Sequence, residues 1–349
     1  MKKIICLIMA LALSIGCAAS AATAEGDKIS VVTTIFPIYD WTREVLGESA
    51  DAQLTLLLDN GVDLHSFQPT AADIMKIATC DVFIYVGGES DEWVEDALEE
   101  AVNPNMIVVN LVEAMGEEIK VEEIVEGMEH EYDDHDDHDE DDHDEDAHDE
   151  DDDHDEDHDH EDKDDHHDHE AEADEHVWLS LRNAQKLVNA ITGALGEADP
   201  ANAGRYQANA AAYCEQLAAL DAEYAQAVSE ASLHTILFGD RFPFRYLVDD
   251  YGLEYYAAFS GCSAETEASF QTIIFLAQKV DELRLPAVLT IEGANHKIAQ
   301  TVIDTTASKD QAQLCMNSMQ GCTLNDVQSG VTYLSVMRDN LEVLRQTLN

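Results

Sequence analysis

Basic residues are scarce in this chain. Lysine and arginine together number 18 against 74 aspartates and glutamates, and the formal net charge is −56. Such a protein repels the phosphates of nucleic acids and anionic lipids, and it concentrates cations near its surface. We therefore expect no nucleic acid among its ligands, and cations become the first partners to consider.

The sequence also lacks the patterns of several site classes. None of its seven cysteines forms a Cys-x-x-Cys pair, so a thiolate metal site is not expected. A His-Glu-x-x-His helix, a nucleophile elbow and a glycine-rich phosphate loop are all missing, which argues against an enzyme. Disulfides remain open: Cys315 could pair with Cys322 or Cys262, and buried free thiols are equally consistent.

Long hydrophobic runs are missing beyond the N-terminus. Two lysines precede the short apolar stretch IICLIMALALSIG, which is typical of a secretory signal and too short for a permanent membrane span. Residues 1–24 can be a signal peptide that ends at Ala22-Thr23-Ala24. Alternatively, a lipoprotein signal ends at Gly16 and leaves a lipidated Cys17. Both predict an extracytoplasmic protein, in the periplasm or on the outer face of the membrane, with membrane contact through the lipid or a partner.

Acidic residues and histidines are concentrated between Glu129 and Glu175. This stretch of 47 residues holds 31 acidic residues, one base and 11 of the 15 histidines. It cannot bury an apolar face and its like charges repel, so residues 129–175 are expected to be a disordered His/Asp-rich loop. A solvated spacer has no need for imidazole. Imidazole beside carboxylate suits zinc and related divalent ions, and the stretch therefore predicts metal capture.

The remaining sequence alternates strands and helices. Runs rich in Val and Ile, separated by helical segments of 10 to 15 residues, predict parallel sheets covered on both faces. An alanine-rich stretch at 200–231 predicts one long helix that links a first α/β lobe at 25–199 to a second at 232–349. The expected strands are 29–36, 52–58, 81–88, 105–112, 234–240, 253–259, 286–293 and 312–317. The expected helices are 37–47, 70–80, 89–102, 243–252, 266–283, 295–306 and 329–348.

Ligand sites in open α/β sheets lie beyond the carboxyl ends of the strands. His65, Asp240, Glu292 and His296 follow predicted strands, and His176 begins a turn into a helix. Each of them alone is equally consistent with a solvated loop residue. Convergence of such groups from both lobes would form a four-ligand nitrogen and oxygen site.

Three segments resemble the zinc/manganese solute-binding proteins of ABC importers. They are GVDLHSFQPTAADIMKIATCDVFIYVGG at 61–88, DEHVWLSLRNAQ at 174–185 and FRYLVDDYGLEYYAAFSGCSAETEAS at 244–269. The resemblance implies two Rossmann-like α/β lobes, one rigid connecting helix and one metal ion in the cleft between the lobes. It also implies that His65 and His176 are the first two metal ligands.

The second lobe departs from the family pattern. Arg241 occupies the position where the family has His or Glu, and an arginine stays protonated. Asp240 is the expected substitute, with Arg241 orienting or neutralising a carboxylate. The late acidic ligand is also missing from LCMNSMQGC, which offers only Asn317 and Gln320, so Glu292 or His296 is expected there.

These observations predict the solute-binding component of a metal importer. The predicted cargo is Zn²⁺, with Mn²⁺ as the alternative, held by His65, His176, Asp240 and Glu292. The predicted partners are an ABC permease and its ATPase, and the protein itself is expected to be a monomer without catalytic activity. The alternatives are a metal buffer or surface adhesin without a transporter, and a zinc hydrolase that uses Glu292 as its base.

Overall fold

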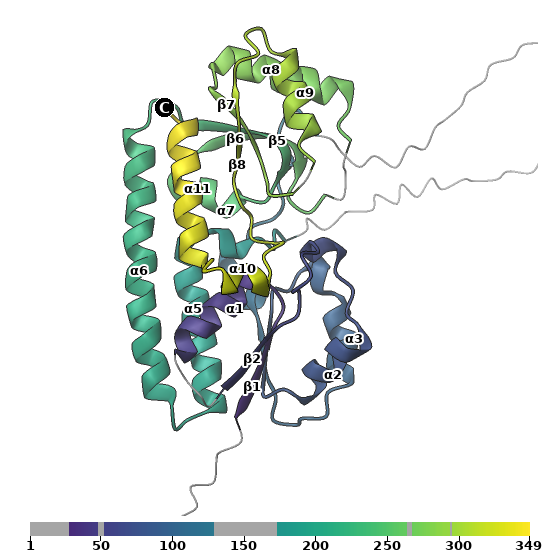
Figure 1. Ribbon diagram of the computed structural model, residues 1–349, viewed down its shortest axis with the longest axis vertical. Helices are drawn as coiled ribbons and strands as arrows, with labels where there is room; N and C mark the ends of the chain where they lie inside the picture. Colours follow the sequence, from purple (N-terminus) through teal and green to yellow (C-terminus); the bar gives the residue numbers. More distant parts are fainter. Residues whose placement is uncertain (1–27, 48–51, 129–172, 264–266, 294) are drawn as a thin grey trace, which may run out of the picture.

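Two α/β lobes make up the part of the chain that the computed structural model describes, which is residues 28–47, 52–128, 173–263, 267–293 and 295–349 (Figure 1). Each lobe is built on a four-stranded parallel sheet. The strand order is β2-β1-β3-β4 in the first sheet and β6-β5-β7-β8 in the second. The predicted fold class, two α/β lobes with parallel sheets, is confirmed.

The first lobe follows local sequence signals closely. Strand β1 is buried at four of its five positions, as expected for a central parallel strand. Thr70 caps helix α2 and forms a capping box with Asp73, which fixes where that helix begins. Its strands are β1 (Ile29–Thr33), β2 (Ala52–Leu56), β3 (Val82–Tyr85) and β4 (Ile107–Asn110), and its helices are α1 (Phe36–Leu46), α2 (Ala71–Thr79), α3 (Trp93–Glu99), α4 (Leu111–Met115) and α5 (Leu181–Ala198).

The second lobe repeats the strand and helix alternation. Helices α8 and α9 pack against its sheet through an apolar cluster that includes Leu237, Leu276 and Val302. The strands are β5 (Thr235–Phe242), β6 (Glu254–Ser260), β7 (Ala287–Thr290) and β8 (Ala312–Cys315). The helices are α7 (Arg245–Tyr251), α8 (Phe270–Leu283), α9 (Lys297–Thr305), α10 (Leu324–Gln328) and α11 (Tyr333–Thr347).

Helix α6 (Ala203–Glu230) runs along one side of both lobes (Figure 1). Its buried side chains recur every three or four residues and so form one stripe. The stripe contacts α5 and α1 of the first lobe and α11 of the second. The helix begins three residues after the predicted start, because a turn at 199–202 first reverses the chain from α5. The stripe comprises Tyr206, Ala210, Tyr213, Leu217, Leu220, Tyr224 and Val228.

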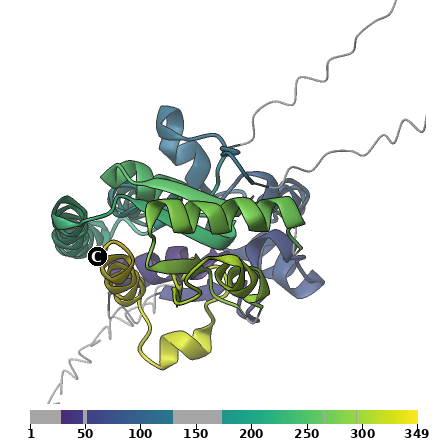
Figure 2. The same cartoon turned by 90° about the horizontal axis from the view of Figure 1, so that it is seen from above.

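The two lobes share one hydrophobic core. Helix α11 belongs to the predicted second lobe, yet it packs on α1 of the first lobe and lies beside α6 when the molecule is seen from above (Figure 2). Tyr333 at its start contacts Trp41 edge to face and donates its N–H to the buried Asp40 at 2.8 Å. Because one apolar cluster continues through the junction, the lobes are joined firmly on this side.

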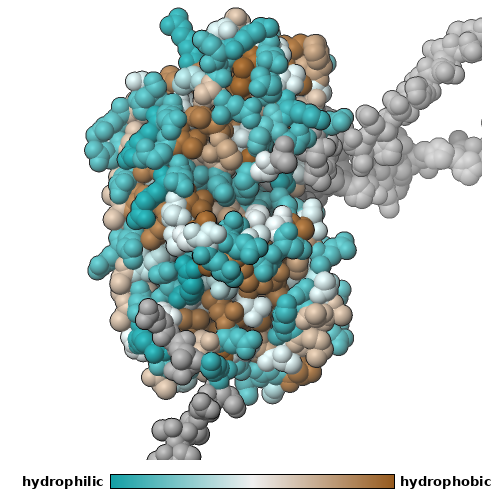
Figure 3. Space-filling model, viewed as in Figure 1, coloured by the Kyte–Doolittle hydropathy of each residue, from teal (hydrophilic) through white to brown (hydrophobic). Residues whose placement is uncertain are grey.

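Hydrophilic side chains cover most of the face shown in Figure 3, and hydrophobic atoms form smaller areas among them. Large exposed apolar residues are dispersed over several elements, for example Met75, Val102 and Phe270. Among the described residues, no helix combines the length and apolar character needed to cross a membrane.

Candidate metal centre

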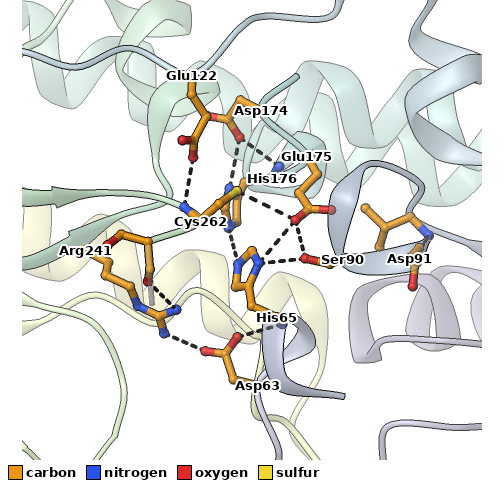
Figure 4. A network of polar contacts seen from close by, with 12 residues as sticks. Asp63, His65, Ser90, Asp91, Glu122, Asp174, Glu175, His176, Arg241 and Cys262 are labelled. Atoms are coloured by element: carbon orange, nitrogen blue, oxygen red, sulfur yellow. Dashed lines mark hydrogen bonds and ion pairs between the residues drawn. The ribbon is translucent and has the colours of Figure 1, made fainter. Parts of the chain in front are cut away.

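Two histidine rings from the first lobe meet between the lobes (Figure 4). His65 lies in a 3₁₀ turn after β2, and the Asp63 carboxylate that caps this turn accepts the His65 N–H at 3.1 Å. His176 is fully buried and precedes the 3₁₀ turn at Val177–Leu179 that leads into α5. Their Nε2 atoms are 3.3 Å apart. A tetrahedral zinc ion with Zn–N bonds of about 2.0–2.1 Å places two ligand nitrogens about 3.4 Å apart, so the observed spacing fits one shared ion.

Hydrogen bonds orient both rings from their opposite sides. Nδ1 of His176 lies 2.9 Å from Oδ1 of Asp174. Nδ1 of His65 lies 2.6 Å from the Ser90 hydroxyl and 3.2 Å from Oε1 of Glu175. A carboxylate at Nδ1 fixes the proton there and leaves the Nε2 lone pair for a metal. The arrangement therefore points both Nε2 atoms toward one place, where an ion that displaces any Nε2 proton would bind two neutral imidazoles.

The supporting carboxylates are themselves buried, with Asp174 3% and Glu175 1% exposed. Burial raises the pKa of Glu175, but the hydrogen bond from His65 and the positive charge of His176 more than offset it and hold the pKa below its usual value. For His176, burial lowers the pKa, and the hydrogen bond and charge of Asp174 reverse that effect and raise it. Such opposite pKa shifts arise where buried carboxylates and imidazole rings stabilise one another's charge.

The last three residues of the predicted disordered loop, residues 173–175, belong to the described part of the chain. Residues 129–172 lie outside the described residues, but Ala173 forms an isolated antiparallel bridge with Val121, and the Asp174 N–H donates to the Lys120 carbonyl at 2.8 Å. Composition alone groups Asp174 and Glu175 with the acidic run. The imidazoles beside them instead compensate their charge in a buried position, which is why they are ordered.

Asp240 and Arg241 face the histidines from the second lobe. Strand β5 continues to Phe242, two residues beyond its predicted end, so Asp240 lies within the strand, at a register shift between Phe238 and Arg241, and not at its carboxyl end. Its two oxygens accept the N–H groups of Arg241 at 2.9 Å and Ile291 at 3.3 Å. Burial raises the pKa of Asp240, although these N–H groups oppose the shift.

Arg241 crosses between the lobes to a first-lobe carboxylate. Its Nη2 lies 2.5 Å from Oδ2 of Asp63, and the side chains are 19% and 29% exposed. Burial raises the pKa of the Asp63 carboxyl group. The charge of the Arg241 guanidinium and its hydrogen bond lower this pKa by more, so the net shift is downward. Arg241 thus neutralises a carboxylate, as expected, and the carboxylate is that of Asp63 in the opposite lobe.

Glu292 and His296 lie on the same side of the pocket as Asp240. All three line a pocket between the lobes together with His65. The Glu292 carboxylate accepts the N–H of Ser318 at 2.6 Å, the hydroxyl of Ser318 at 2.8 Å and the N–H of Gln320 at 3.1 Å. Both predicted second-lobe ligands, Asp240 and Glu292, are therefore occupied by hydrogen-bond donors of their own lobe.

Cys262 joins the two histidines, which the sequence analysis did not expect. One ligand atom from each of His65, His176 and Cys262 lies within 4.8 Å of the others. Sγ of Cys262 is also 3.7 Å from Oε1 of Glu175. Burial, with added repulsion from Glu122 and Glu175, raises the pKa of the Cys262 thiol. The five described cysteines are all free, so of the alternatives left open, free thiols are the ones found.

Gln320 closes the remaining side of the His176 ring. With its amide nitrogen toward Asp63, the Gln320 amide oxygen lies 2.9 Å from Nε2 of His176. Gln320 was one of the two polar residues noted in LCMNSMQGC, whereas Cys262, Asp174 and Glu175 were missed. Asp174 had a signal, because it begins the quoted segment DEHVWLSLRNAQ, two residues before His176. Cys262 lies two residues beyond the end of β6, where ligand residues were sought, but only cysteine pairs were considered.

Comparison with known proteins gives a consistent result. The description of the matching family model is zinc-uptake complex component A, periplasmic, and it covers residues 31–347. The zinc-binding lipoprotein AdcA of Streptococcus pneumoniae is 31% identical over 348 residues, which cover 99% of this chain and 61% of AdcA. The high-affinity zinc uptake system protein ZnuA of Bacillus subtilis is 27% identical over 98% of this chain and 95% of that protein.

The fold is also shared with solved structures. The Zn(II)-bound ZnuA-like domain of S. pneumoniae AdcA matches with a TM-score of 0.65 and 27% identity, over 92% of this chain and 99% of that domain. This chain spans 61% of the length of full AdcA. The similarity therefore concerns the two-lobed part of that longer protein.

Proposed function

Because the chain belongs to the family of periplasmic zinc-uptake component A proteins, we propose that it captures a zinc ion between its lobes and delivers it to an ABC importer. The supporting observation is the 3.3 Å separation of the His65 and His176 Nε2 atoms, with both rings oriented by buried carboxylates. Zinc is the cargo, and the protein is a binding component and not an enzyme.

The donor set favours zinc over manganese. Two imidazoles suit zinc, whereas manganese prefers a site made mostly of oxygen. Asp240 and Glu292 remain the predicted oxygen ligands. To bind the ion, each carboxylate would have to give up a hydrogen bond that it accepts within its own lobe. Manganese is the alternative cargo if both of them do so.

Delivery requires the contacts between the lobes to open. Helix α6 and the shared core join the lobes firmly on one side, and the Arg241–Asp63 ion pair joins them beside the histidines. We propose that the protein acts as a monomer outside the cytoplasm and that docking on a permease and its ATPase separates this ion pair and exposes the ion. Chemical crosslinking in membranes of the source organism tests this step. Recovery of a permease supports import, and its absence under zinc limitation favours the buffer or adhesin alternative.

Zinc affinity of a double variant tests the site itself. We expect His65→Ala combined with His176→Ala to lose tight binding in a competition titration with a chromophoric chelator, by at least about a hundredfold. His234→Ala, which removes an exposed histidine outside the site, is the matched control and should bind like the wild type. Tight binding by the double variant would refute the proposed site.

A further inference from the structure

We propose that the Cys262 thiolate is the third ligand of the captured ion and that it makes the site selective for zinc over manganese. This inference rests on the proposed function, since it concerns the same ion. The motivating observation is that Cys262 is the second-lobe member of a three-residue group with His65 and His176.

The backbone holds Cys262 against the first lobe. Gly261 follows β6 and packs on the His176 ring so closely that a Cβ at this position would lie 3.0 Å from Cε1 of His176 and 3.0 Å from the Phe242 carbonyl. Any larger residue would push the end of β6 away from the ring. The Cys262 N–H in turn donates to Oε1 of Glu122 in the first lobe at 2.8 Å. Contacts on both sides therefore fix the position from which the sulfur projects (Figure 4).

The distances suit a shared tetrahedral ion after a small movement. With Zn–S of about 2.3 Å and Zn–N of about 2.0–2.1 Å, sulfur and nitrogen ligands of one ion lie about 3.6 Å apart. The three donor atoms are already within 4.8 Å of one another. A shift of about 1 Å, within reach of a side-chain rotation, brings Sγ to ligand distance. The thiol proton leaves to solvent as the S–Zn bond forms.

The carboxylate alternatives in the second lobe already accept hydrogen bonds. Arg241, which stands at the position of a family ligand, pairs with Asp63, and Asp240 accepts two backbone N–H groups. Glu292 accepts three donors from Ser318 and Gln320. Sulfur at Cys262 is thus a second-lobe donor that the ion can recruit without breaking hydrogen bonds within that lobe. The buried Nδ1 of His296 also has no hydrogen-bond partner, but His296 is not part of the group that Cys262 forms with His65 and His176.

Selectivity follows from the softness of sulfur. Thiolate binds zinc and cobalt well and manganese poorly, because manganese prefers carboxylate, carbonyl and water oxygens. A site of two histidines and one cysteine therefore discriminates between zinc and manganese. A site of two histidines and one carboxylate would bind the two metals with more similar affinities. Metal ions bound by the acidic run at 129–175 cannot give a thiolate signal, because this run contains no cysteine.

Cobalt provides a direct spectroscopic test. One equivalent of Co²⁺ is added to the purified, reduced wild type, Cys262→Ser, Cys262→Asp and Cys214→Ser proteins, and the near-ultraviolet thiolate-to-cobalt charge-transfer band is recorded. We expect the band in the wild type and in Cys214→Ser, and its loss in both Cys262 variants. Zinc affinity should fall more than about tenfold in Cys262→Ser. The zinc-to-manganese affinity ratio should fall furthest in Cys262→Asp, whose oxygen ligand suits manganese.

The outcomes separate this inference from the proposed function. A wild type that binds zinc tightly but shows no thiolate band, or a Cys262→Ser variant that keeps the band, would overturn the role of Cys262 and leave zinc capture standing. A wild type that binds neither zinc nor cobalt tightly would overturn the proposed function. Circular dichroism of the metal-free variants checks folding, and a Cys262→Asp protein that folds and binds manganese provides the readout if Cys262→Ser does not fold.

Discussion

The two lobes meet the candidate site in different ways. In the first lobe, the Nε2 atoms of His65 and His176 face one another, with the Gln320 amide oxygen beside His176, and the buried Asp174 and Glu175 hold the rings from behind. In the second lobe, the carboxylates of Asp240 and Glu292 accept hydrogen bonds from neighbouring backbone or side-chain donors. One lobe is thus built to bind before the ion arrives, while the other is stable without it.

This difference assigns separate tasks to the lobes. A preformed pair of imidazoles loses little side-chain entropy on binding, so the first lobe supplies affinity. The second lobe contributes an ion pair to Asp63 and, by our inference, one sulfur ligand. We expect first-lobe substitutions near the site to affect zinc binding more than second-lobe substitutions of similar chemistry.

The largest expected effect comes from the end of the acidic run. Deleting residues 130–171 should leave affinity at the tight site within about threefold and remove the weak sites. Adding Asp174→Asn and Glu175→Gln to this deletion should weaken the tight site about a hundredfold or more, because both rings then lose their orienting carboxylates. Isothermal titration of zinc measures both classes of site. Loss of the tight site in the simple deletion would make the run itself the primary binder.

Single substitutions compare the lobes directly. Asp174→Asn in the first lobe should weaken zinc binding about 10- to 100-fold, since the amide is a poorer acceptor for Nδ1 of His176. The counterpart Asp240→Asn in the second lobe should cost less than about threefold in the same competition titration. An equal or greater loss at Asp240 would contradict the comparison and make its carboxylate a metal ligand.

Glu292→Gln tests whether this carboxylate serves mainly the fold. Its oxygens accept three hydrogen bonds from Ser318 and Gln320, and an amide can replace only some of them. We expect the free energy of unfolding of the metal-free protein to fall by about 1–3 kcal/mol in urea titrations. Zinc affinity should fall less than tenfold. A loss of affinity with unchanged stability would show instead that Glu292 binds the ion.

The effect expected furthest from the site is a pH dependence of stability at Asp40, whose carboxylate accepts the N–H of Tyr333 at the start of α11. Burial, opposed by Arg43, raises the pKa of Asp40 to about 6. The folded protein then holds a proton that the unfolded chain releases near its ordinary pKa of 3.8, so this residue makes the free energy of unfolding fall as pH rises from about 4 to 6. The contribution is about 2 kcal/mol over that interval.

Asp40→Asn should remove that part of the slope, and the surface variant Asp310→Asn should keep it. Denaturant unfolding of the metal-free proteins at several pH values between 4 and 7 measures the difference. An identical slope in wild type and Asp40→Asn would show that the buried carboxyl group does not hold its proton.

The sequence predicted the fold well, because the signals that fix its helices and strands lie within short stretches of residues. Thr70 was expected to cap α2 and does so, and the alanine-rich stretch forms α6. The family resemblance was carried by motifs around His65 and His176, and it is confirmed by the match over residues 31–347. Such features depend on residues a few positions apart, and the sequence displays them directly.

The second-lobe half of the site could not be predicted in the same way. The Arg241–Asp63 pair joins residues 178 positions apart. Cys262 meets His176 only because β6 ends at that ring, and no spacing rule reveals such an approach. Asp174 and Glu175 have the composition of the acidic run, and their burial depends on the rings beside them. The sequence shows which groups can bind metal, and the packing of the lobes decides which of them meet.

The bridge between Val121 and Ala173 has a practical consequence. It ties Ala173, where the described chain resumes, to the segment that ends at Met128, so we expect a change in the number of residues between these two points to leave the ring positions unchanged. A fluorescent domain spliced into that interval would therefore sit beside the zinc site without entering it.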